Sequence, residues 1–308
     1  MLSRVADSLY WMARYIERGE HTARIIGVQL NLILDQTSLS ADDRWKLILD
    51  SLGDPDLPND ARDPAALTHA LLWDPSCGAS ITSSMNNARE NCRQVRNHIS
   101  SEMWEQLNRL YHMVRRHSAD PRHSIPLEFL LSVDEGIHLF HGIADSSMSH
   151  NEAWQFIQIG RFLERATNTS NLLDVHFRHR SHHHLEWIGL LRSCTAFEAY
   201  CRARTADVRP DWALEFLLLD DAFPHSVRFS VDRVREALAT LEGPGELGER
   251  LGRIVGRLQA SLRFIDIDEV MDTGVRLKLE EIQQQCDQIH LAVQQTYIDY
   301  SIEEALGA

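Results

Sequence analysis

Apolar residues recur at intervals of three and four along most of the chain, which is the period of an amphipathic α-helix. Alternating runs of Val, Ile and Thr, which would indicate strands, are almost absent. The pattern therefore predicts an all-α protein. The expected helices span residues 3–35, 42–52, 80–99, 101–117, 126–147, 150–180, 185–204, 210–220, 226–241, 246–265 and 274–303. Loops are expected around Pro55, Pro58 and Pro64 and at Gly243-Pro244-Gly245, because proline and glycine interrupt helices.

The first predicted helix carries two stripes of side chains. One is an ordinary apolar face, made of Leu2, Val5, Ala6, Leu9, Met12, Ala13, Ile16, Ala23, Leu30 and Leu34. The opposite stripe consists of Tyr10, Arg14, Glu17, Arg18 and His21, followed by Ile25, Val28 and Leu32. A face exposed to solvent would not normally continue into apolar residues. We therefore expect this helix to be enclosed on both sides, with its charged residues in the interior or lining a cleft.

The charged stripe occurs twice in the chain. Arg14, Glu17 and Arg18 recur as Arg161, Glu164 and Arg165, at an offset of 147 residues (161 minus 14), and at this offset His21 corresponds to Asn168. Two further blocks recur in the same order: Leu72-Trp73-Asp74 as Leu218-Leu219-Asp220, and Trp45 as Trp187. Repeated blocks of this kind predict an internal duplication. We expect a single helical domain over residues 1–308, built from two similar halves of about 1–147 and 148–308 with no Gly/Ser-rich or Pro-rich linker between them.

Composition narrows the classes of function. The chain has 308 residues, 44% of them hydrophobic, so it can bury a sizeable core. Its net charge of −14 argues against a protein that holds nucleic acid by general electrostatics. Five cysteines, an odd number, favour reduced thiols over disulfides. The first residues do not form a signal peptide and no apolar run is long enough to span a membrane, so we expect a cytoplasmic protein with no membrane partner.

Charged residues that are enclosed need partners, because an unpaired buried ion is costly. Within the first helix, Arg14 can reach Glu17 at i,i+3, and Glu17 can reach His21 at i,i+4. Across the repeat, Glu164 is a candidate partner for Arg18, and Glu17 for Arg165. The helices carrying Glu17 and Glu164 are therefore expected to pack together about a pseudo-two-fold axis.

Two interpretations of this cluster remain open. It is either an ion-pair lock between helices or a cleft that binds an anionic or amide substrate. Four arginines face only two glutamates, so a cleft would retain positive charge unless acids such as Glu90 and Glu236 turned inward. In that case we expect an anion to bind near Arg18 or Arg165.

Several blocks of sequence are specific enough to indicate a family. They are MLSRVADSLYWMARYIER at residues 1–18, AREN at 88–91, SSEMWEQLN at 100–108, GRFLER at 160–165, RP at 209–210, LEFLLLD at 214–220 and FP at 223–224. In these blocks, which are spread over the whole chain, the sequence resembles the alpha-E family of bacterial helical proteins, which are named for a Glu-Arg motif. One departure is His21 within Gly19-Glu20-His21-Thr22, where the family usually has Ala-Glu-Asn-Thr.

The resemblance implies that the protein works together with other proteins. Such proteins are typically found with a circularly permuted ATP-grasp protein and a transglutaminase-like protein, which implies synthesis or trimming of amide-linked peptides. On this interpretation Arg18 and Arg165 clamp a peptide or amino-acid carboxylate, and Glu17 and Glu164 bind an amine or act as acid and base. The cleft would be completed by Arg14, Arg161, His21, Asn168, Arg89, Glu90 and Asn91. The alternative is a non-catalytic adaptor whose charged core is structural.

Two groups of residues could hold a metal, although we assign none and expect no cofactor. His176, His179, His182, His183 and His184 have spacings that suit zinc or nickel, but a solvated helix end explains them as well. Glu135 and His138 have the Glu-x-x-His spacing of di-iron bundles, for which Asp287 and His290 are only a partial second motif. No phosphate-binding loop, dinucleotide turn or nucleophile elbow is present.

Overall fold

The computed structural model describes residues 1–34, 40–53, 56–57, 63–119, 127–179, 184–204, 207–241 and 245–299. Within these residues the protein is all-α, with fourteen α-helices, a short 3₁₀ helix, a terminal π turn and no strand. The α-helices are α1 (Ser3–Leu34), α2 (Ala41–Ser51), α3 (Pro64–Trp73), α4 (Ile81–Gln94), α5 (Ser101–Ser118), α6 (Leu127–Ser147), α7 (Glu152–Arg178), α8 (His184–Ser193), α9 (Phe197–Ala203), α10 (Pro210–Leu219), α11 (Val227–Thr240), α12 (Gly245–Arg263), α13 (Ile267–Thr273) and α14 (Val275–Val293). The predicted fold class is confirmed.

Two helices were not predicted from the sequence. Helix α3 begins at Pro64, where a loop was expected, because Asp63 caps it by accepting a hydrogen bond from the Ala66 amide and proline fits the first helical position. Helix α13 begins after Asp266, which accepts hydrogen bonds from two amides of the first turn. Both helices are short, so neither shows an extended apolar period.

The helix expected over 185–204 is two helices. α8 ends at Ser193, and α9 begins at Phe197. Between them Thr195 adopts a positive φ of 53°, which a β-branched residue rarely does. The chain turns there, and the Ala196 amide donates to the Leu191 carbonyl at 2.7 Å. The helix expected over 80–99 also ends early, at Gln94, and a 3₁₀ turn (Arg96–His98) follows it.

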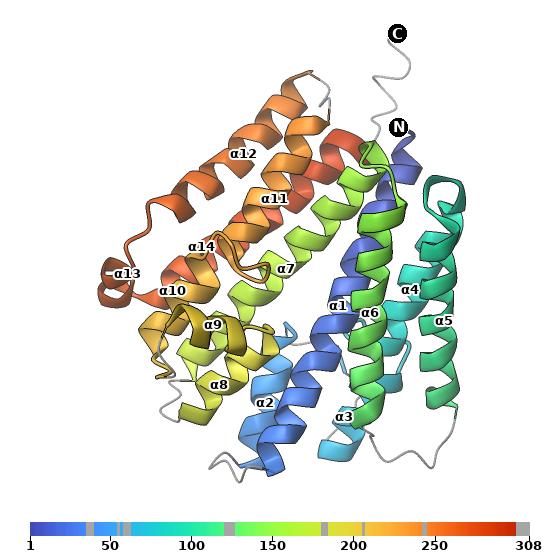
Figure 1. Ribbon diagram of the computed structural model, residues 1–308. Coiled ribbons are helices and arrows are strands. Elements are labelled where there is room, and N and C mark those ends of the chain that lie inside the picture. The colour runs from blue at the N-terminus through green and yellow to red at the C-terminus, as the bar shows by residue number, and fades with distance from the viewer. Residues whose placement is uncertain are drawn as a thin grey trace.

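Helices α1 and α7 run beside each other through the middle of the molecule (Figure 1). α1 packs against α4 and α6, and α7 packs against α11 and α14. α5 covers α4 and α6 on one side, while α12 covers α11 and α14 on the other (Figure 1). The predicted packing of the two helices that carry Glu17 and Glu164 is confirmed.

Hydrogen bonds around α1 recur around α7. The Thr22 hydroxyl donates to the Ala79 carbonyl at 2.8 Å, and the Thr169 hydroxyl donates to the His225 carbonyl at 3.0 Å. Ser80 caps α4 by accepting from the Ser83 amide. Ser226 caps α11 in the same way, accepting from the Phe229 amide. The two central helices are thus tied to their neighbours by the same kinds of contact.

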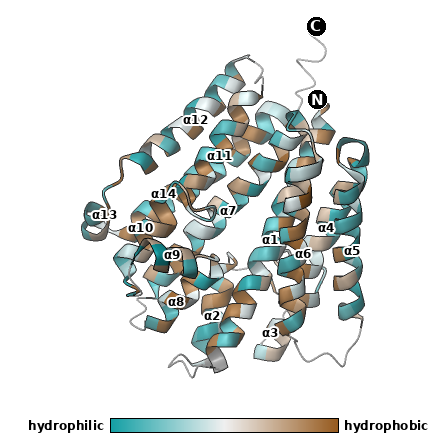
Figure 2. Cartoon of the chain, in the orientation of Figure 1, coloured by the Kyte–Doolittle hydropathy of each residue, from teal (hydrophilic) through white to brown (hydrophobic). Residues whose placement is uncertain are grey.

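Apolar side chains line the contacts between helices, and the outer helices alternate between hydrophilic and hydrophobic faces (Figure 2). Both stripes of α1 are largely buried, as expected for an enclosed helix. Leu2 is an exception to the predicted apolar face, since 74% of it is exposed at the start of the chain. The side chain of Leu34 lies outside the described residues.

Gly160 allows α1 and α7 to approach closely. A Cβ atom at this position would lie 2.3 Å from the Tyr10 carbonyl oxygen, which belongs to the backbone of α1. Real Cβ atoms do not come that close to a backbone oxygen, so the observed helix separation requires glycine here. The close contact places charged side chains from both helices within reach of each other one turn further along.

All five cysteines are free, and four of them are buried. Among the described residues, no helix combines the length and the apolar character needed to cross a membrane.

Candidate functional site

Glu164 of α7 is paired with two arginines of α1. Its Oε2 atom lies 2.5 Å from Arg14 Nε, and its Oε1 atom lies 2.9 Å from Arg18 Nε. The predicted pair between Arg18 and Glu164 is confirmed. Arg14 contacts Glu164 rather than Glu17, its neighbour at i,i+3, because the carboxylate of α7 lies opposite it. Arg14 also donates to the Tyr10 hydroxyl at 3.1 Å.

Glu17 of α1 is paired reciprocally with two arginines of α7. Arg165 binds it through two nitrogens, Nε at 2.9 Å from Oε2 and Nη2 at 2.7 Å from Oε1. Arg161 Nε lies 3.3 Å from Oε1. The predicted pair between Glu17 and Arg165 is therefore confirmed. Each glutamate of the repeated motif thus accepts hydrogen bonds from two arginines of the opposite helix.

The cluster is buried rather than open. Glu17, Glu164 and Arg165 are 3–4% exposed. Only the side chains of Arg18 and Arg161 retain appreciable contact with solvent, at 30% and 15% exposed. The cavity beside Glu17 and Arg165 has a volume of about 20 Å³, which is room for one water molecule. The predicted substrate cleft at this point is thus too small for an amino acid.

A second set of charges extends the cluster and was not predicted. Glu20 is 1% exposed, and Arg24 Nη2 lies 2.5 Å from its Oε1 atom. Arg24 also forms an ion pair with Asp134 of α6. With these groups, five arginines face four carboxylates, so the excess of positive charge expected from four arginines and two glutamates is reduced. The signal was present in the sequence as Glu20 and Arg24 at i,i+4, but their partner Asp134 is distant along the chain.

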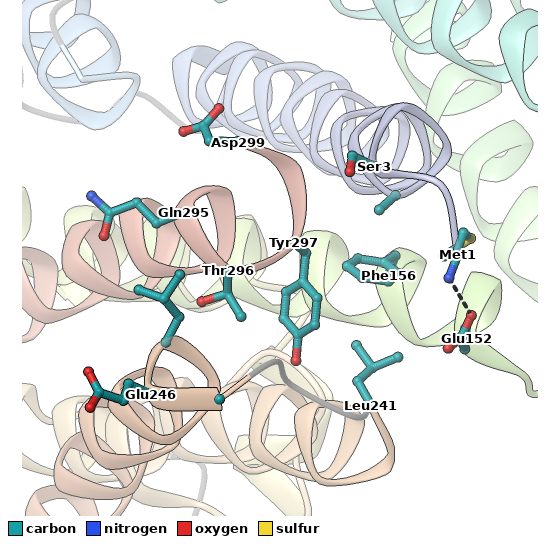
Figure 3. A pocket seen from close by; sticks show the side chains of 13 residues that line it. Met1, Ser3, Glu152, Phe156, Leu241, Glu246, Gln295, Thr296, Tyr297 and Asp299 are labelled. Atoms are coloured by element: carbon teal, nitrogen blue, oxygen red, sulfur yellow. Dashed lines mark ion pairs between the residues drawn. The ribbon is translucent and has the colours of Figure 1, made fainter. Parts of the chain in front are cut away.

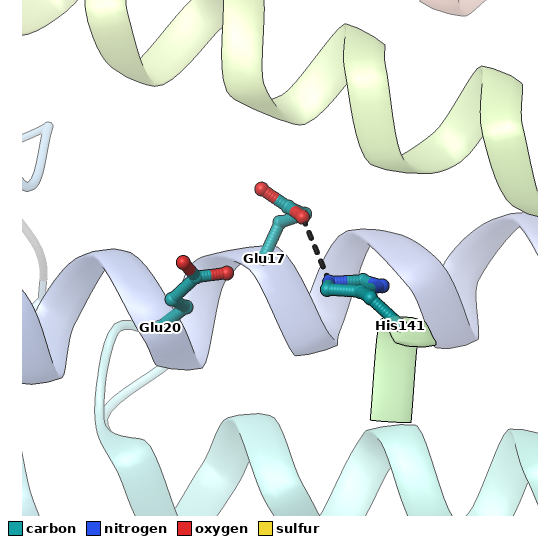
Figure 4. Close-up of side chains that lie close together, drawn as sticks. All are labelled: Glu17, Glu20 and His141. Carbon is teal, nitrogen blue, oxygen red and sulfur yellow. Dashed lines mark ion pairs between the residues drawn. The ribbon is translucent and has the colours of Figure 1, made fainter. Parts of the chain in front are cut away.

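His141 of α6 approaches Glu17 from the other side (Figure 4). Its Nε2 atom lies 3.0 Å from Glu17 Oε1, but without the alignment of a hydrogen bond. Glu17, Glu20 and His141 have donor atoms within 4.8 Å of one another, and so have Glu20, Asp134 and His138. A divalent cation at either place would compete with the arginines already bound to these carboxylates and would add charge to a cluster that already has more cations than anions. The charge balance therefore disfavours a metal.

The arginines set the ionisation of both glutamates. Burial, the largest single effect, would raise the pKa of Glu17, but the Arg165 charge and the neighbouring His141 together hold that pKa well below its usual range. Burial likewise opposes ionisation of Glu164, yet Arg14 and Arg18 lower its pKa. A carboxylate with a depressed pKa is a poor general acid or base near neutral pH. The geometry therefore favours a structural role for Glu17 and Glu164 over the tentative catalytic one.

His21 and Asn168 lie beside the cluster. His21 does not pair with Glu17, because its ring faces α2, where Nε2 lies 3.5 Å from the Ser51 carbonyl oxygen. Burial lowers the pKa of His21 to about 4, so it is neutral at pH 7. Both residues line the small cavity next to Glu17.

Arg89, Glu90 and Asn91 do not join the cluster, which corrects the predicted site. In α4 the buried residues Met85, Ala88 and Cys92 lie on the inner face, so residues 89–91 lie toward the outer side. Arg89 Nε donates to Asn108 of α5 at 2.8 Å, and Glu90 forms an exposed ion pair with Arg93. Asn91 donates to the Asn87 carbonyl. Glu236 also stays at the surface, paired with Arg233.

Among the described residues, neither of the two possible metal motifs is assembled. In the histidine-rich segment, His176 is buried with Nδ1 2.8 Å from the Leu172 carbonyl, and His179 lies 2.9 Å from Asp50. His184 is exposed at the start of α8, while His182 and His183 lie outside the described residues. Glu135 and Asp287 are both exposed. His290 is engaged with the Tyr10 hydroxyl at 2.8 Å, so a four-helix di-iron arrangement is not formed.

A separate cavity of about 780 Å³ lies where the start of α1 meets α7, α12 and the π turn (Gln294–Ile298) (Figure 3). Phe156 and Tyr297 supply its aromatic wall, and Glu152, Glu246 and Asp299 supply carboxylates. None of its lining residues belongs to the buried cluster. This cavity, which is large enough for a ligand, is therefore separate from the repeated charged motif.

Comparison with known proteins gives a family match. The family model described as Alpha-E, a predicted alpha-helical domain with a conserved ER motif, matches residues 1–298. Uncharacterized proteins of Mycobacterium bovis and Mycobacterium tuberculosis are 25% identical to the chain over 307 residues. The match covers 91% of this chain but 34% of each relative, so the chain spans about a third of the length of these relatives. No solved structure matches the chain.

Proposed function

We propose that this chain, which belongs to the Alpha-E family, is a non-catalytic helical partner in a system that makes or modifies peptide-like amide bonds. Its expected partners are a circularly permuted ATP-grasp protein and a transglutaminase-like protein. This part of the proposal rests on the family resemblance. In the mycobacterial relatives the matching region is joined to about twice as much additional chain, so there it is one part of a larger protein.

One observation carries the non-catalytic role. Both glutamates of the repeated Glu-Arg motif are buried and bound by arginines from the opposite helix. Groups held in this way are poor acids and bases, and the space beside them fits only one water molecule. We infer that the motif joins α1 to α7 and thereby holds the two sides of the molecule in register.

We further infer that the two halves arose by duplication of one helical unit. The repeated motif, the matched neighbours of α1 and α7 and the paired threonine and serine contacts all support this origin. A protein of this kind, with five free thiols, suits the reducing cytoplasm.

Co-purification tests the proposed partnership. The chain would be expressed with the ATP-grasp protein and the transglutaminase-like protein of the same organism, each with a separate tag. We expect a stable complex with at least one of them, and no hydrolysis of ATP or amide bonds by the chain alone. Turnover of either substrate by the purified chain would contradict the non-catalytic role.

A second candidate function is recognition of a ligand carboxylate at Arg18. This residue is the most exposed arginine of the cluster, at 30%, and its guanidinium lies 5.5 Å from the Tyr15 ring centre. Arg18 uses Nε for Glu164, and the other guanidinium nitrogens are the natural fork for a second carboxylate.

Titration calorimetry with amino acids and short acidic peptides tests this candidate. Binding that is lost in Arg18→Gln and retained in Arg93→Gln, a surface control, would support it. Absence of binding to the parent protein would leave only the partner-binding role.

A further inference from the structure

The α4–α5 pair is positively charged although the protein is acidic. Residues 81–118 contain six arginines and three acidic residues, a net charge of +3, whereas the remaining residues sum to −17 (−14 minus +3). Helix α5 packs mainly on α4 and α6 and lies at the edge of the molecule (Figure 1). The positive region is therefore on an outer face.

Arginine and aromatic side chains alternate along this face. Arg96 lies over the Trp104 ring, with 5.0 Å from its guanidinium carbon to the ring centre. Arg89 lies between Trp104 and Tyr111, at 5.5 Å and 4.4 Å from their ring centres. Asn108 accepts a hydrogen bond from Arg89 Nε at 2.8 Å and so fixes the plane of that guanidinium. We call these residues the Arg–aromatic stripe: Arg89, Arg96, Trp104, Asn108 and Tyr111.

The stripe presents guanidinium groups that are oriented but not neutralised. In the described part of the chain, neither Arg89 nor Arg96 forms an ion pair, in contrast to the arginines of the buried cluster. Stacking on a ring holds a guanidinium flat and leaves N–H groups at its edge to bind a carboxylate. Such preorganisation lowers the entropy that binding would otherwise cost.

The corresponding arginine of the second half is used differently. Arg235, which matches Arg89 in the repeated Arg-Glu pair, donates from Nη1 to the Gly252 carbonyl of α12 at 2.7 Å. Its guanidinium thus serves packing between two helices. The Arg–aromatic stripe is not required by the helix arrangement, since the second half packs α11 against α12 without one.

We propose that the Arg–aromatic stripe is a docking site for an acidic peptide segment of a partner protein. Carboxylates suit it because a guanidinium can donate two parallel hydrogen bonds to one carboxylate. This face is also a positive exception on an acidic molecule that repels anions elsewhere. Single-stranded nucleic acid suits it less well, because its bases would have to displace arginines from the rings on which they would stack. The inference rests on the proposed partner-binding role and adds the chemistry of the partner.

Fluorescence anisotropy with a labelled oligoglutamate peptide tests the docking site, with oligoglutamine as the uncharged reference probe. We expect oligoglutamate to bind and oligoglutamine not to bind. The double variant Arg89→Gln, Arg96→Gln should weaken oligoglutamate binding by roughly tenfold or more. The matched control is Arg109→Gln, Arg116→Gln, which removes the same charge from α5 without touching a ring, and it should bind nearly as well as the parent.

Trp104→Leu separates orientation from charge, because it removes the ring and retains both arginines. We expect weaker binding at an unchanged net charge, provided that the circular dichroism melt shows a folded protein. Conversely, the conservative Trp104→Phe should retain most of the binding.

Three results would overturn the docking site: no binding of oligoglutamate to the parent, equal losses in the two double variants, or tighter binding of a single-stranded RNA than of oligoglutamate. The synthetic probe keeps this test apart from the partnership itself. If co-purification with the ATP-grasp protein fails while oligoglutamate binds the stripe, the proposed partner is contradicted and the proposed docking site is supported.

Discussion

At the scale of single residues, the costly change is the loss of one partner from a buried ion pair. Glu164 neutralises Arg14 and contacts Arg18 in a place with almost no solvent. Glu164→Gln keeps the shape but leaves Arg14 without a carboxylate, so we expect it to lower the free energy of unfolding by about 3–5 kcal/mol. Urea denaturation measures this loss. Glu90→Gln, which removes an exposed partner of Arg93, is the control and should unfold at the parent's midpoint.

Protonation of His176 should make folding sensitive to mild acid. Burial lowers the pKa of His176 from 6.5 to about 4. The unfolded chain therefore takes up this proton at higher pH than the folded protein, and stability is lost as pH falls from about 6.5 to about 4. One such histidine contributes a slope of about 1.4 kcal/mol per pH unit in that range.

The variant His176→Phe removes this titration. We expect the slope of unfolding free energy against pH, measured by denaturation between pH 6.5 and pH 4, to become shallower by that amount. His184→Gln, at an exposed position, should follow the parent curve. An unchanged slope in His176→Phe would contradict this account, because it would show that the pKa of His176 does not differ between the folded and the unfolded protein.

Sequence reasoning found some of the residue pairs and missed others. The pairs Glu17–Arg165 and Arg18–Glu164 were predictable because the motif repeats and enclosed ions must find opposite charges. The Arg24–Asp134 contact was not, since nothing in a single sequence brings those positions together. The predicted contact between His21 and Glu17 was wrong. Helical spacing permits that contact, but it does not reveal that the Ser51 carbonyl of α2 is also within reach of His21.

At the scale of elements, the contact between α1 and α7 depends on a missing side chain. Gly160→Ala would place a Cβ atom 2.3 Å from the Tyr10 carbonyl oxygen, so the two helices must separate. Alanine gains about 1 kcal/mol of helix propensity over glycine, but overpacking against a backbone costs typically about 1–3 kcal/mol or more. We expect a lower melting temperature, measured by circular dichroism.

A second glycine provides the control for that experiment. A Cβ atom at Gly142 of α6 would have no neighbour within 4 Å. Gly142→Ala should therefore keep the propensity gain and melt at or slightly above the parent's temperature. If both alanine variants melt higher than the parent, the close approach of α1 and α7 is wrong.

Long helices were easier to predict than short ones. α1, α5, α6 and α7 follow their apolar periods to within a few residues of the expected ends. The break between α8 and α9 lies at Thr195, whose positive φ is one that a β-branched residue rarely adopts, so local propensity does not predict it. A loop was predicted at Pro64 because proline disrupts the interior of a helix. Proline is favourable in the first turn of a helix, however, and α3 begins at Pro64.

At the scale of the whole molecule, the helices packed on α1 and those packed on α7 meet along these two central helices, and the meeting surface is electrostatic as well as apolar. Buried ion pairs add little net stability over a hydrophobic contact, but they penalise misalignment strongly. We infer that the repeated Glu-Arg motif fixes the register of the two sides. On this inference, outer faces such as the Arg–aromatic stripe are held at constant positions relative to one another, as the proposed docking of a partner requires.

The central claim is that Glu17 and Arg165 act as one unit that joins α1 to α7. A double-mutant cycle measures this directly, with Glu17→Gln, Arg165→Met and the combined variant unfolded in urea. Each single variant strands charge and should cost about 3–5 kcal/mol, and the combined variant should cost less than their sum by roughly 1–3 kcal/mol. Additivity to within about 0.5 kcal/mol would mean that the two residues do not interact, and it would contradict the lock.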